Sequence, residues 1–311
     1  MTSVHLGLDV GGTASRWVAC ETGGKVLARG DVGGATAHVF NPAERVRLAS
    51  MLEQLARAVA GAGLAATSLV AGFTGFGAAA AADIGAMAGT ALGIVPETVL
   101  VTDDIVLAYA AHFQPGQGHL ISAGTGSIGI HVTRAGETIR VGGRGILIDD
   151  AGSGSWIALR ALDHIFRVLD RQGDFAGVEL LAEQMFALVG GRDWHDVRQY
   201  VYAGDRGRIG ALALGVARAA EAGDPVALGI LGRAGTELAR LAHALQRRAG
   251  PEPVAIIGGV LQLHTIIVQS LTESLPGADL TCPTIDTALA AARLRPGHAW
   301  HALLGMGPAK P

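Results

Sequence analysis

The sequence has 311 residues and a formal net charge of −3, from 24 Lys and Arg residues against 27 Asp and Glu residues. This length exceeds one comfortable hydrophobic core and predicts two domains. Half of the residues are hydrophobic and only 16% are charged, a composition that excludes an intrinsically disordered chain. The near-zero net charge, without a basic block, argues against nucleic acid and against an acidic membrane surface as partners.

The cysteines and the first residues indicate a reducing, cytoplasmic setting. Cys20 and Cys282 are too few for a disulfide framework or a four-ligand zinc site. No basic segment precedes the first patterned strand, so no signal peptide is expected. The uncharged run at 58–82 contains several glycines and little Leu, Ile or Val, so we do not expect it to span a membrane.

The N-terminal third predicts three antiparallel strands joined by tight turns, at 4–10, 17–20 and 25–31. Asn41, Pro42 and Glu44 form the start signal of a helix predicted over 42–62. Two further strands, at 68–73 and 98–102, flank an alanine-rich helix at 78–92. Another helix is expected to begin near Asp104.

The second part of the sequence repeats the opening pattern. Strands are predicted at 119–123, 127–133 and 138–142, followed by helical periodicity from 153 to about 250. A buried strand at 254–257 and a helix at 286–294 complete the chain. The segments 5–13 and 119–127 both consist of an apolar strand, a Gly/Thr turn and the start of a second strand, which indicates a duplicated α/β domain with its boundary near 115–118.

Two glycine-rich hairpins are candidates for phosphate binding. Gly11-Gly12-Thr13 and Gly124-Thr125-Gly126-Ser127 would each expose backbone N–H groups and a hydroxyl that can bind anionic oxygens. Asp9, just before the first turn, could hold a magnesium ion. Each motif alone also fits an ordinary hairpin, but two such turns, 113 residues apart, favour one phosphate-binding hairpin in each domain.

A strand that ends in Asp103 and Asp104 is the candidate catalytic element. A carboxylate at that position can accept a proton from a substrate hydroxyl that faces a γ-phosphate. Helix capping is the alternative, since aspartate commonly caps helices. Gly258-Gly259, where a strand meets the next element, would let a purine lie against bare backbone, and close packing is its alternative.

The segment after the third strand of the second half carries the most specific signal. It reads Gly143-Arg144-Gly145-Ile146-Leu147-Ile148-Asp149-Asp150-Ala151-Gly152-Ser153-Gly154-Ser155-Trp156-Ile157. This resembles the Gly-x-Gly…Asp-Glu-Gly-Ser-x-x-Trp-Ile signature of N-acetylglucosamine kinases and of the related ATPases that activate benzoyl-CoA reductase and hydroxyacyl-CoA dehydratases. With both hairpins and Gly258-Gly259, the resemblance runs through nearly the whole chain in the right order.

The resemblance implies a member of the actin, hexokinase and heat-shock ATPase superfamily. The implied α/β fold has duplicated ribonuclease H-like (actin-like ATPase) domains around a nucleotide-binding cleft. Residues 1–116 would form the N-terminal domain, completed by a C-terminal helix at 289–311, and residues 117–288 the C-terminal domain with a helical insertion. ATP and Mg2+ are the implied cofactors.

The family's functional residues are carried over position by position. Asp104 is the expected base, because Ala108 supplies the small residue that the family favours four positions later, and Asp103 is its alternative. The expected nucleotide-binding residues are Gly11, Gly12, Thr13, Gly124, Thr125, Gly126, Ser127, Gly258 and Gly259. The expected sugar-binding residues are Thr36, His38, Gly75, Gly145 and Asp150, and Asp9 is expected at the metal.

Several positions depart from the family pattern. Arg144 stands where the sugar kinases have tryptophan, and Ala37 where an asparagine is expected. Asp149 and Ala151 replace the signature's glycine and glutamate. These changes bear on which sugar is bound and leave the kinase constellation intact. The cysteines do not match the iron–sulfur ligands of the dehydratase activators, which makes that role less fitting.

The sequence therefore predicts an ATP-dependent kinase that phosphorylates the 6-hydroxyl of N-acetylglucosamine or a related hexosamine. A kinase for glucosamine or glucose, an ATPase switch acting on a protein partner, and a nucleotide-binding module without turnover stay open as alternatives. The expected partners are a small-molecule sugar and a second copy of the chain in a homodimer, with no nucleic acid and no membrane.

Overall fold

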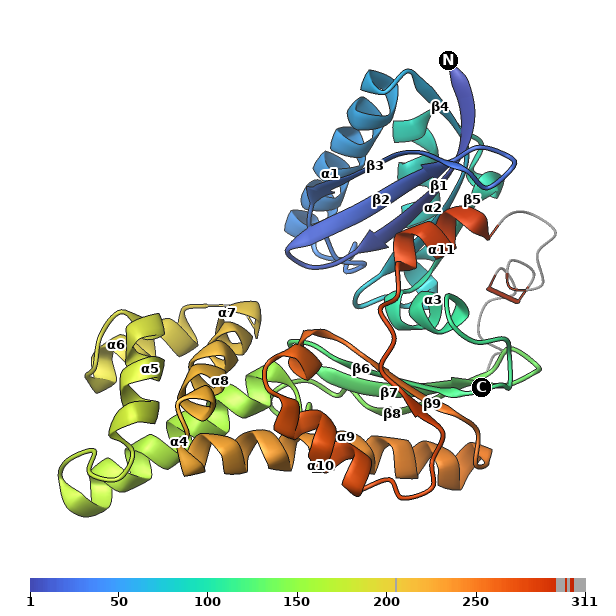
Figure 1. Ribbon diagram of the computed structural model, residues 1–311. Helices are drawn as coiled ribbons and strands as arrows, with labels where there is room; N and C mark the ends of the chain where they lie inside the picture. Colours follow the sequence, from blue (N-terminus) through green and yellow to red (C-terminus); the bar gives the residue numbers. More distant parts are fainter. Residues whose placement is uncertain (205, 295–299, 301–302, 305–311) are drawn as a thin grey trace. The chain divides into compact units, whose positions relative to one another are not determined.

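The computed structural model describes residues 1–204, 206–294, 300 and 303–304 (Figure 1). The chain divides into two compact units. The first contains Met1–Gln117, Val132–Thr138 and the described residues from Thr284 onward. The second contains Gly118–His131 and the described residues of Ile139–Pro283.

The first unit is built on a five-stranded sheet in the order β3-β2-β1-β4-β5. Its strands are β1 (Thr2–Val10), β2 (Ala14–Cys20), β3 (Val26–Gly33), β4 (Leu64–Phe73) and β5 (Val99–Asp103). The predicted antiparallel meander of the first three strands is confirmed, and β4 and β5 join β1 in parallel. The fourth strand begins four residues earlier than the sequence pattern indicated, at Leu64 rather than Ser68.

Helices cover both faces of this sheet. They are α1 (Pro42–Gly61), α2 (Ala81–Leu92), α3 (Asp104–Ala110) and α11 (Thr287–Arg293), with 3-10 turns at Ala78–Ala80 and Pro96–Thr98. Alternate residues of β2 separate the faces: Trp17 and Ala19 share a core with residues of α1 and α2, whereas Val18 and Cys20 pack against α11. The strand period of two therefore decides which helix each side chain meets.

Gly7 allows α11 to lie directly on β1. A Cβ atom at this position would overlap the backbone of Ala288 and Ala292. The backbones of α11 and β1 are therefore in direct contact, and a helix from late in the chain packs on its first strand.

The second unit has a five-stranded sheet in the order β10-β9-β6-β7-β8. Its strands are β6 (His119–Ala123), β7 (Ser127–Val132), β8 (Thr138–Gly142), β9 (Val254–Ile257) and β10 (Leu280–Thr281). The hairpin of β6 and β7 is antiparallel, and β9 pairs with β6 in parallel. Apart from the short β10, each of these strands was predicted.

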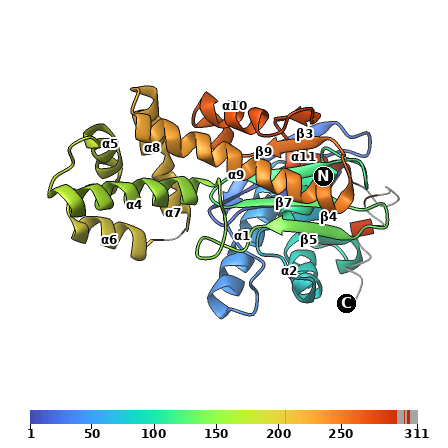
Figure 2. The same ribbon diagram turned by 90° about the horizontal axis from the view of Figure 1, so that it is seen from below.

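Within the described residues, the helical stretch predicted from 153 to about 250 contains six helices. These are α4 (Gly154–Gln172), α5 (Glu179–Val189), α6 (Trp194–Tyr202), α7 (Arg206–Ala211), α8 (Ala213–Glu221) and α9 (Pro225–Ala249). A 3-10 turn at Gly259–Gln262 and α10 (Thr265–Glu273) follow β9, and Figure 2 shows α10 beside α9. One face of α9 is buried, and it includes Ile230, Ala234 and Leu238.

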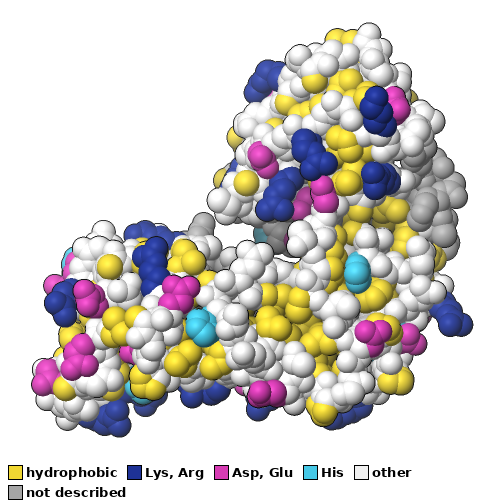
Figure 3. Space-filling view, viewed as in Figure 1, with side chains coloured by type: hydrophobic (Ala, Val, Ile, Leu, Met, Phe, Trp, Pro, Cys, Tyr) yellow, Lys and Arg dark blue, Asp and Glu magenta, His cyan; other side chains and the backbone are white. Residues whose placement is uncertain are grey.

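The surface mixes charges of both signs with apolar groups on the face shown in Figure 3. Among the described residues, no helix combines the length and the apolar character that crossing a membrane requires.

Gly7 provides a test of the packing of α11. Gly7→Ala would force a methyl group into the backbone of α11, and we expect a loss of about 1–3 kcal/mol in the free energy of unfolding. Thermal and urea denaturation would measure the change. The control is Gly85→Ala in α2, where a Cβ atom has no neighbour within 4 Å, and this variant should match or exceed the wild-type stability. Equal stability of Gly7→Ala and wild type would contradict the direct contact.

Candidate active site

Three parallel strands bring the candidate residues of the first unit to one edge of its sheet. In the register, Val10 pairs with Phe73, and Phe73 pairs with Asp103. The chain therefore leaves β1, β4 and β5 at the same edge, toward Gly11, Thr74 and Asp104 respectively. The Thr74 amide donates a hydrogen bond to the Val10 carbonyl over 3.1 Å, which ties two of these exits together. This is the edge at which open α/β sheets bind ligands.

The first hairpin presents open backbone at that edge. The Gly11 amide donates to the Ala14 carbonyl over 3.2 Å and closes the turn. Gly12 has open space where a side chain would lie, and no described residue accepts a hydrogen bond from the Gly12 or Thr13 amide. Gly34 packs against the backbone of this turn so closely that a Cβ atom there would overlap it. The hairpin is thus supported from behind and open in front, as an anion-binding nest requires.

Asp103 and Asp104 lie where β5 passes into α3. The Asp103 carboxylate caps the helix by accepting a hydrogen bond from the Ile105 amide over 3.1 Å. The Asp104 carboxylate accepts from the same amide over 2.7 Å. Asp103 is also buried. The shared Ile105 amide holds both carboxyl groups at the start of α3. The predicted capping arrangement is present, with one amide shared by the two side chains.

The environment of Asp104 favours its protonated form. Burial, followed by the negative charge of Asp103 and a hydrogen bond with that side chain, raises the pKa of Asp104 from 3.8 to about 7. The Ile105 amide acts in the opposite direction, and the charge of Asp9 adds to the increase. A carboxyl group with a pKa near neutrality can accept and return a proton at physiological pH.

Asp9 belongs to the same electrostatic group. Burial raises its pKa, the Arg16 guanidinium lowers it, and the carboxylate of Asp286 raises it again. Within the part of the chain that the structure describes, no three acidic, His or Cys side chains gather as a protein-only metal cage. Mg2+ commonly binds through one or two carboxylates together with phosphate oxygens and water, so a single carboxylate beside a hairpin that is predicted to bind phosphate fits that ion.

The predicted sugar-binding residues of the first unit lie together beside this edge. The Ala37 amide donates to the Thr74 carbonyl over 3.2 Å, which joins the loop containing Thr36 and His38 to the end of β4. The His38 ring occupies the space in front of Gly75, where a Cβ atom would collide with the imidazole. Thr36, His38 and Gly75 therefore share one surface with the first hairpin.

The second hairpin is anchored by the start of α4. The Gly154 amide donates to the Gly124 carbonyl over 2.9 Å, and the Ser155 amide donates to the Thr125 carbonyl over 3.2 Å. The Gly124 amide closes the turn on the Gly126 carbonyl over 2.9 Å. The signature segment that gave the family resemblance thus positions this hairpin directly.

Asp150 lies against the same hairpin. It is 3% exposed, has a φ of 66°, and its carboxylate accepts a hydrogen bond from the Ser127 amide over 3.5 Å. Burial raises the pKa of Asp150, whereas the amides of Ser127 and Gly145 and the charge of Arg206 lower it. The structure brings Gly145, Asp150 and the hairpin together, and the sugar contact expected for Asp150 stays a prediction.

Gly258 lies at the end of β9, next to the β6–β7 hairpin. Its φ is 116°, and a Cβ atom would overlap the Ala123 carbonyl, so the position requires glycine. Ser122 pairs with Ile257 in the sheet, which places Gly258 and Gly259 at the strand edge from which the second hairpin extends. The close-packing role considered for Gly258 is therefore present in the structure, and binding of adenosine stays a prediction.

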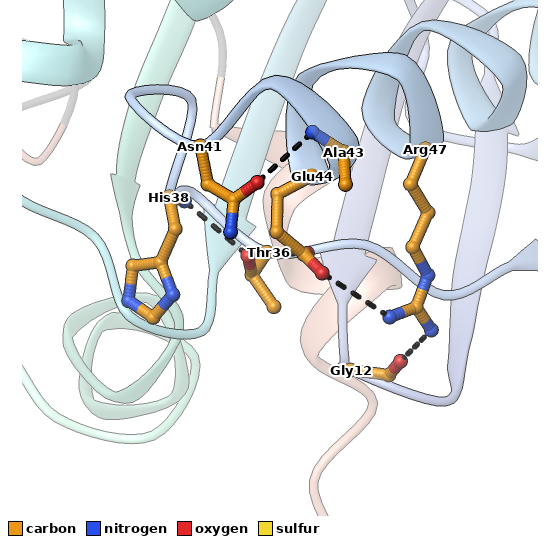
Figure 4. Close-up of polar contacts among 7 residues, drawn as sticks. All are labelled: Gly12, Thr36, His38, Asn41, Ala43, Glu44 and Arg47. Atoms are coloured by element: carbon orange, nitrogen blue, oxygen red, sulfur yellow. Dashed lines mark hydrogen bonds and ion pairs between the residues drawn. The ribbon is translucent and has the colours of Figure 1, made fainter.

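Two polar residues of α1 were not recognised as site residues from the sequence. Glu44 served only as a helix-start signal, and Arg47 carried no signal at all. In the structure, Glu44 accepts a hydrogen bond from the Thr36 hydroxyl over 2.8 Å, and Arg47 donates to the Gly12 carbonyl (Figure 4). Their spacing of three residues places them on one face of α1. The sequence does not show that this face meets the Thr36 loop and the first hairpin.

Comparison with known proteins decides the family. The profile of the BadF/BadG/BcrA/BcrD ATPase family matches residues 6–289, which is most of the chain. The chain belongs to this family. A curated relative, the N-acetylmuramic acid/N-acetylglucosamine kinase of Clostridium acetobutylicum, is 28% identical over 142 residues. That match covers 45% of this chain and 45% of the relative, so it spans about half of the relative's length.

Solved structures with the same architecture extend the comparison of this ATPase family. A protein from Chromobacterium violaceum, assigned as an N-acetylglucosamine kinase, is 27% identical with a TM-score of 0.73, over 94% of this chain and 99% of that chain. The ROK family glucokinase of Streptomyces griseus, solved with glucose and AMPPNP, has a TM-score of 0.59 at 16% identity, with the same shares covered. These likenesses confirm the predicted fold class, two ribonuclease H-like domains of the actin-like ATPase type.

The raised pKa of Asp104 predicts a pH dependence of stability. Its folded-state pKa of about 7 lies above the ordinary 3.8, so folding favours the protonated carboxyl group. The stability that this group contributes is therefore present at low pH and is lost as the pH rises from about 4 through about 7. Asp104→Asn cannot ionise, and we expect its melting temperature to fall less than that of the wild type between about pH 5 and pH 8.

The exposed Asp83 of α2 supplies the control for this measurement. Its side chain is 57% exposed, and Asp83→Asn should keep the wild-type pH dependence. An Asp104→Asn variant with the same pH dependence as the wild type would contradict the raised pKa.

Proposed function

We propose that the protein is an ATP-dependent sugar kinase that phosphorylates the 6-hydroxyl of N-acetylglucosamine or a related hexosamine. The observation that carries the proposal is the position of Asp104, at the point where β5 passes into α3. The raised pKa of this carboxyl group, about 7, suits a general base. It lies at the sheet edge that also carries the first hairpin and the loop of Thr36 and His38. Membership of an ATPase family and likeness to two proteins named or assigned as N-acetylglucosamine kinases support the donor and the class of acceptor.

Asp104 acts as the base in the proposed reaction. As the sugar hydroxyl oxygen attacks the γ-phosphorus, its proton passes to the Asp104 carboxylate, and the bond from the γ-phosphorus to the β–γ bridging oxygen breaks. The products are the sugar phosphate and ADP. The amides of Gly12 and Thr13 are proposed to bind phosphate oxygens and to stabilise the negative charge of the transition state.

Each glycine-rich segment has a proposed contact with the nucleotide. The second hairpin, Gly124 to Ser127, is proposed to bind phosphate oxygens, and Gly258 with Gly259 to accept the adenosine. Mg2+, when bound, would neutralise phosphate charge, and Asp9 is the residue proposed to hold it. Thr36, His38, Gly75, Gly145 and Asp150 are proposed to bind the sugar.

The choice of sugar is tested by ADP release with a panel of acceptors. We expect N-acetylglucosamine to stimulate turnover of Mg·ATP above the rate without sugar, with glucosamine and glucose as the competing acceptors in the panel. Appearance of phosphate on carbon 6 of the product, detected by phosphorus NMR, would establish the position. Turnover that is indifferent to every sugar would contradict the kinase and favour an ATPase switch.

The base is tested with a pair of neighbouring variants. Asp104→Asn should lower kcat at least about a hundredfold while nucleotide binding is retained, because only the proton acceptor is lost. The wild-type rate should also fall as the pH drops below about 7, where Asp104 becomes protonated. Single-turnover kinetics would measure the chemical step, and nucleotide titration would measure binding separately.

Asp103→Asn is the matched control for Asp104→Asn. Asparagine caps a helix about as well as aspartate, so this change should keep α3 capped and most turnover should remain, whereas Asp103→Ala should cost about 0.5–2 kcal/mol in stability. If the two variants behave in the opposite way, the base is Asp103. If neither variant loses activity, the proposed mechanism is wrong.

A further inference from the structure

A polar network on the first turns of α1 joins the loop of Thr36 to the first hairpin. This α1 network consists of Thr36, Glu44, Arg47 and the Gly12 carbonyl. The Thr36 hydroxyl donates to Glu44 Oε2 over 2.8 Å, and Glu44 Oε1 lies 3.8 Å from Arg47 Nη1. Arg47 Nη2 donates to the Gly12 carbonyl (Figure 4). The network therefore runs without interruption between two segments to which we assign different substrates.

The start of α1 determines where these side chains lie. The Asn41 side chain caps the helix by accepting from the Ala43 amide over 2.9 Å, and Pro42 takes the first helical position. Glu44 then falls in the first turn and Arg47 one turn later, on the same helix face. The capping signal in the sequence thus fixes the face that meets the Thr36 loop and the hairpin.

The contact of Arg47 with the Gly12 carbonyl bears on the neighbouring amide. Gly12 C=O and Thr13 N–H belong to one planar trans peptide group and point in opposite directions. A guanidinium that holds the carbonyl therefore also holds the direction of the Thr13 N–H, one of the proposed phosphate donors. Hydrogen bonding at the carbonyl also polarises the peptide group and strengthens its N–H as a donor.

The other end of the network lies on the loop of Thr36 and His38, the sugar loop, which is proposed to bind the acceptor. The Thr36 hydroxyl donates to Glu44 and accepts a hydrogen bond from the His38 amide over 3.3 Å. A change in the orientation of Thr36 would therefore move the hydroxyl donor that holds the Glu44 carboxylate. The backbone couples the same segments, because the Ala35 amide donates to the Gly11 carbonyl over 3.1 Å.

The network is a poor candidate for a purely stabilising role. The side chains of Arg47 and Glu44 are 45% and 26% exposed, and ion pairs at such sites contribute little to stability. A second pair on the same helix, Arg57 with Glu53 at 3.7 Å, is more exposed, and no contact with the hairpin or the sugar loop is found for it among the described residues.

We infer that Glu44 and Arg47 are positioning residues that couple sugar binding at the Thr36 loop to the orientation of the Thr13 amide in the first hairpin. The inference rests on the proposed function and adds a mechanism by which the acceptor sugar increases the affinity for the phosphate donor. Coupling of this kind is reciprocal, so nucleotide binding would increase the affinity for sugar by the same factor.

Calorimetric titration of the full-length protein with Mg·AMP-PNP, with and without saturating N-acetylglucosamine, tests the coupling. We expect sugar to increase the nucleotide affinity of the wild type at least about fivefold. Arg47→Met should weaken nucleotide binding and abolish the sugar effect. Glu44→Gln should keep the nucleotide affinity without sugar within about twofold of the wild type and lose the increase.

Arg57→Met is the control on the same helix, and it should retain both the nucleotide affinity and the sugar effect. Arg47→Lys keeps the positive charge but has one nitrogen in place of the two guanidinium nitrogens that face Glu44 and the Gly12 carbonyl. It should recover part of the nucleotide affinity but not the sugar effect. Melting temperatures of all variants would show that each is folded. Wild-type affinity and a wild-type sugar effect in Arg47→Met would overturn the inference.

Failure of the proposed function gives a different result. If the wild type binds Mg·AMP-PNP but no sugar changes its affinity or turnover, both the kinase and the coupling are wrong. In that case the nucleotide affinity without sugar still tests whether Arg47 positions the first hairpin. A lower affinity in Arg47→Met than in Arg57→Met would support it, and equal affinities would overturn it.

Discussion

The parallel pairing of β1, β4 and β5 is the constraint on which the first unit depends. Parallel strands run in one direction, so their carboxyl ends and the segments that follow them meet at one edge of the sheet. This pairing collects the first hairpin, the Thr74–Gly75 turn and the Asp103–Asp104 pair from segments far apart in the sequence. Gly7 lets α11 lie against the sheet at backbone distance. The five-stranded sheet of the first unit therefore supports α11 and also carries the unit's candidate site residues.

Acidic groups that lie close together at a partly buried sheet edge repel one another, and this repulsion makes ionisation of Asp104 unfavourable. The charge of Asp103 and burial both oppose ionisation of Asp104, and Asp9 adds to the effect. A surface carboxyl group would be ionised at neutral pH and would be a weak base. The cap of α3 offsets part of this electrostatic cost, because the two carboxylates supply acceptors for the Ile105 amide, which lies in the first turn and has no acceptor within the helix. The pair thus combines a structural role with a group suited to proton transfer.

Local sequence signals predicted most of the fold and the backbone parts of the site. The two hairpins, the start of α1 at Asn41 and Pro42, and the Asp pair at the end of β5 all follow from short-range rules. The early start of β4 was missed because Leu64–Thr67 is rich in alanine and lacks strand alternation. The helices between 154 and 249 were predicted only as one helical stretch, since continuous apolar periodicity hides short breaks, and α10 was not predicted. The contacts of Arg47 and Asp150 depend on tertiary neighbours that no local pattern encodes.

The proposed chemistry depends on a carboxyl group at this sheet edge that can accept a proton near neutral pH. Carbon-13 NMR titration of the Asp104 side-chain carboxyl, assigned by comparison with Asp104→Asn, measures this property directly. We expect a midpoint at about pH 7 for the wild type and a lower midpoint in Asp103→Asn, because the neighbouring negative charge is removed. A wild-type midpoint near the ordinary value of 3.8 would show that Asp104 is ionised at neutral pH and that its surroundings do not raise its pKa.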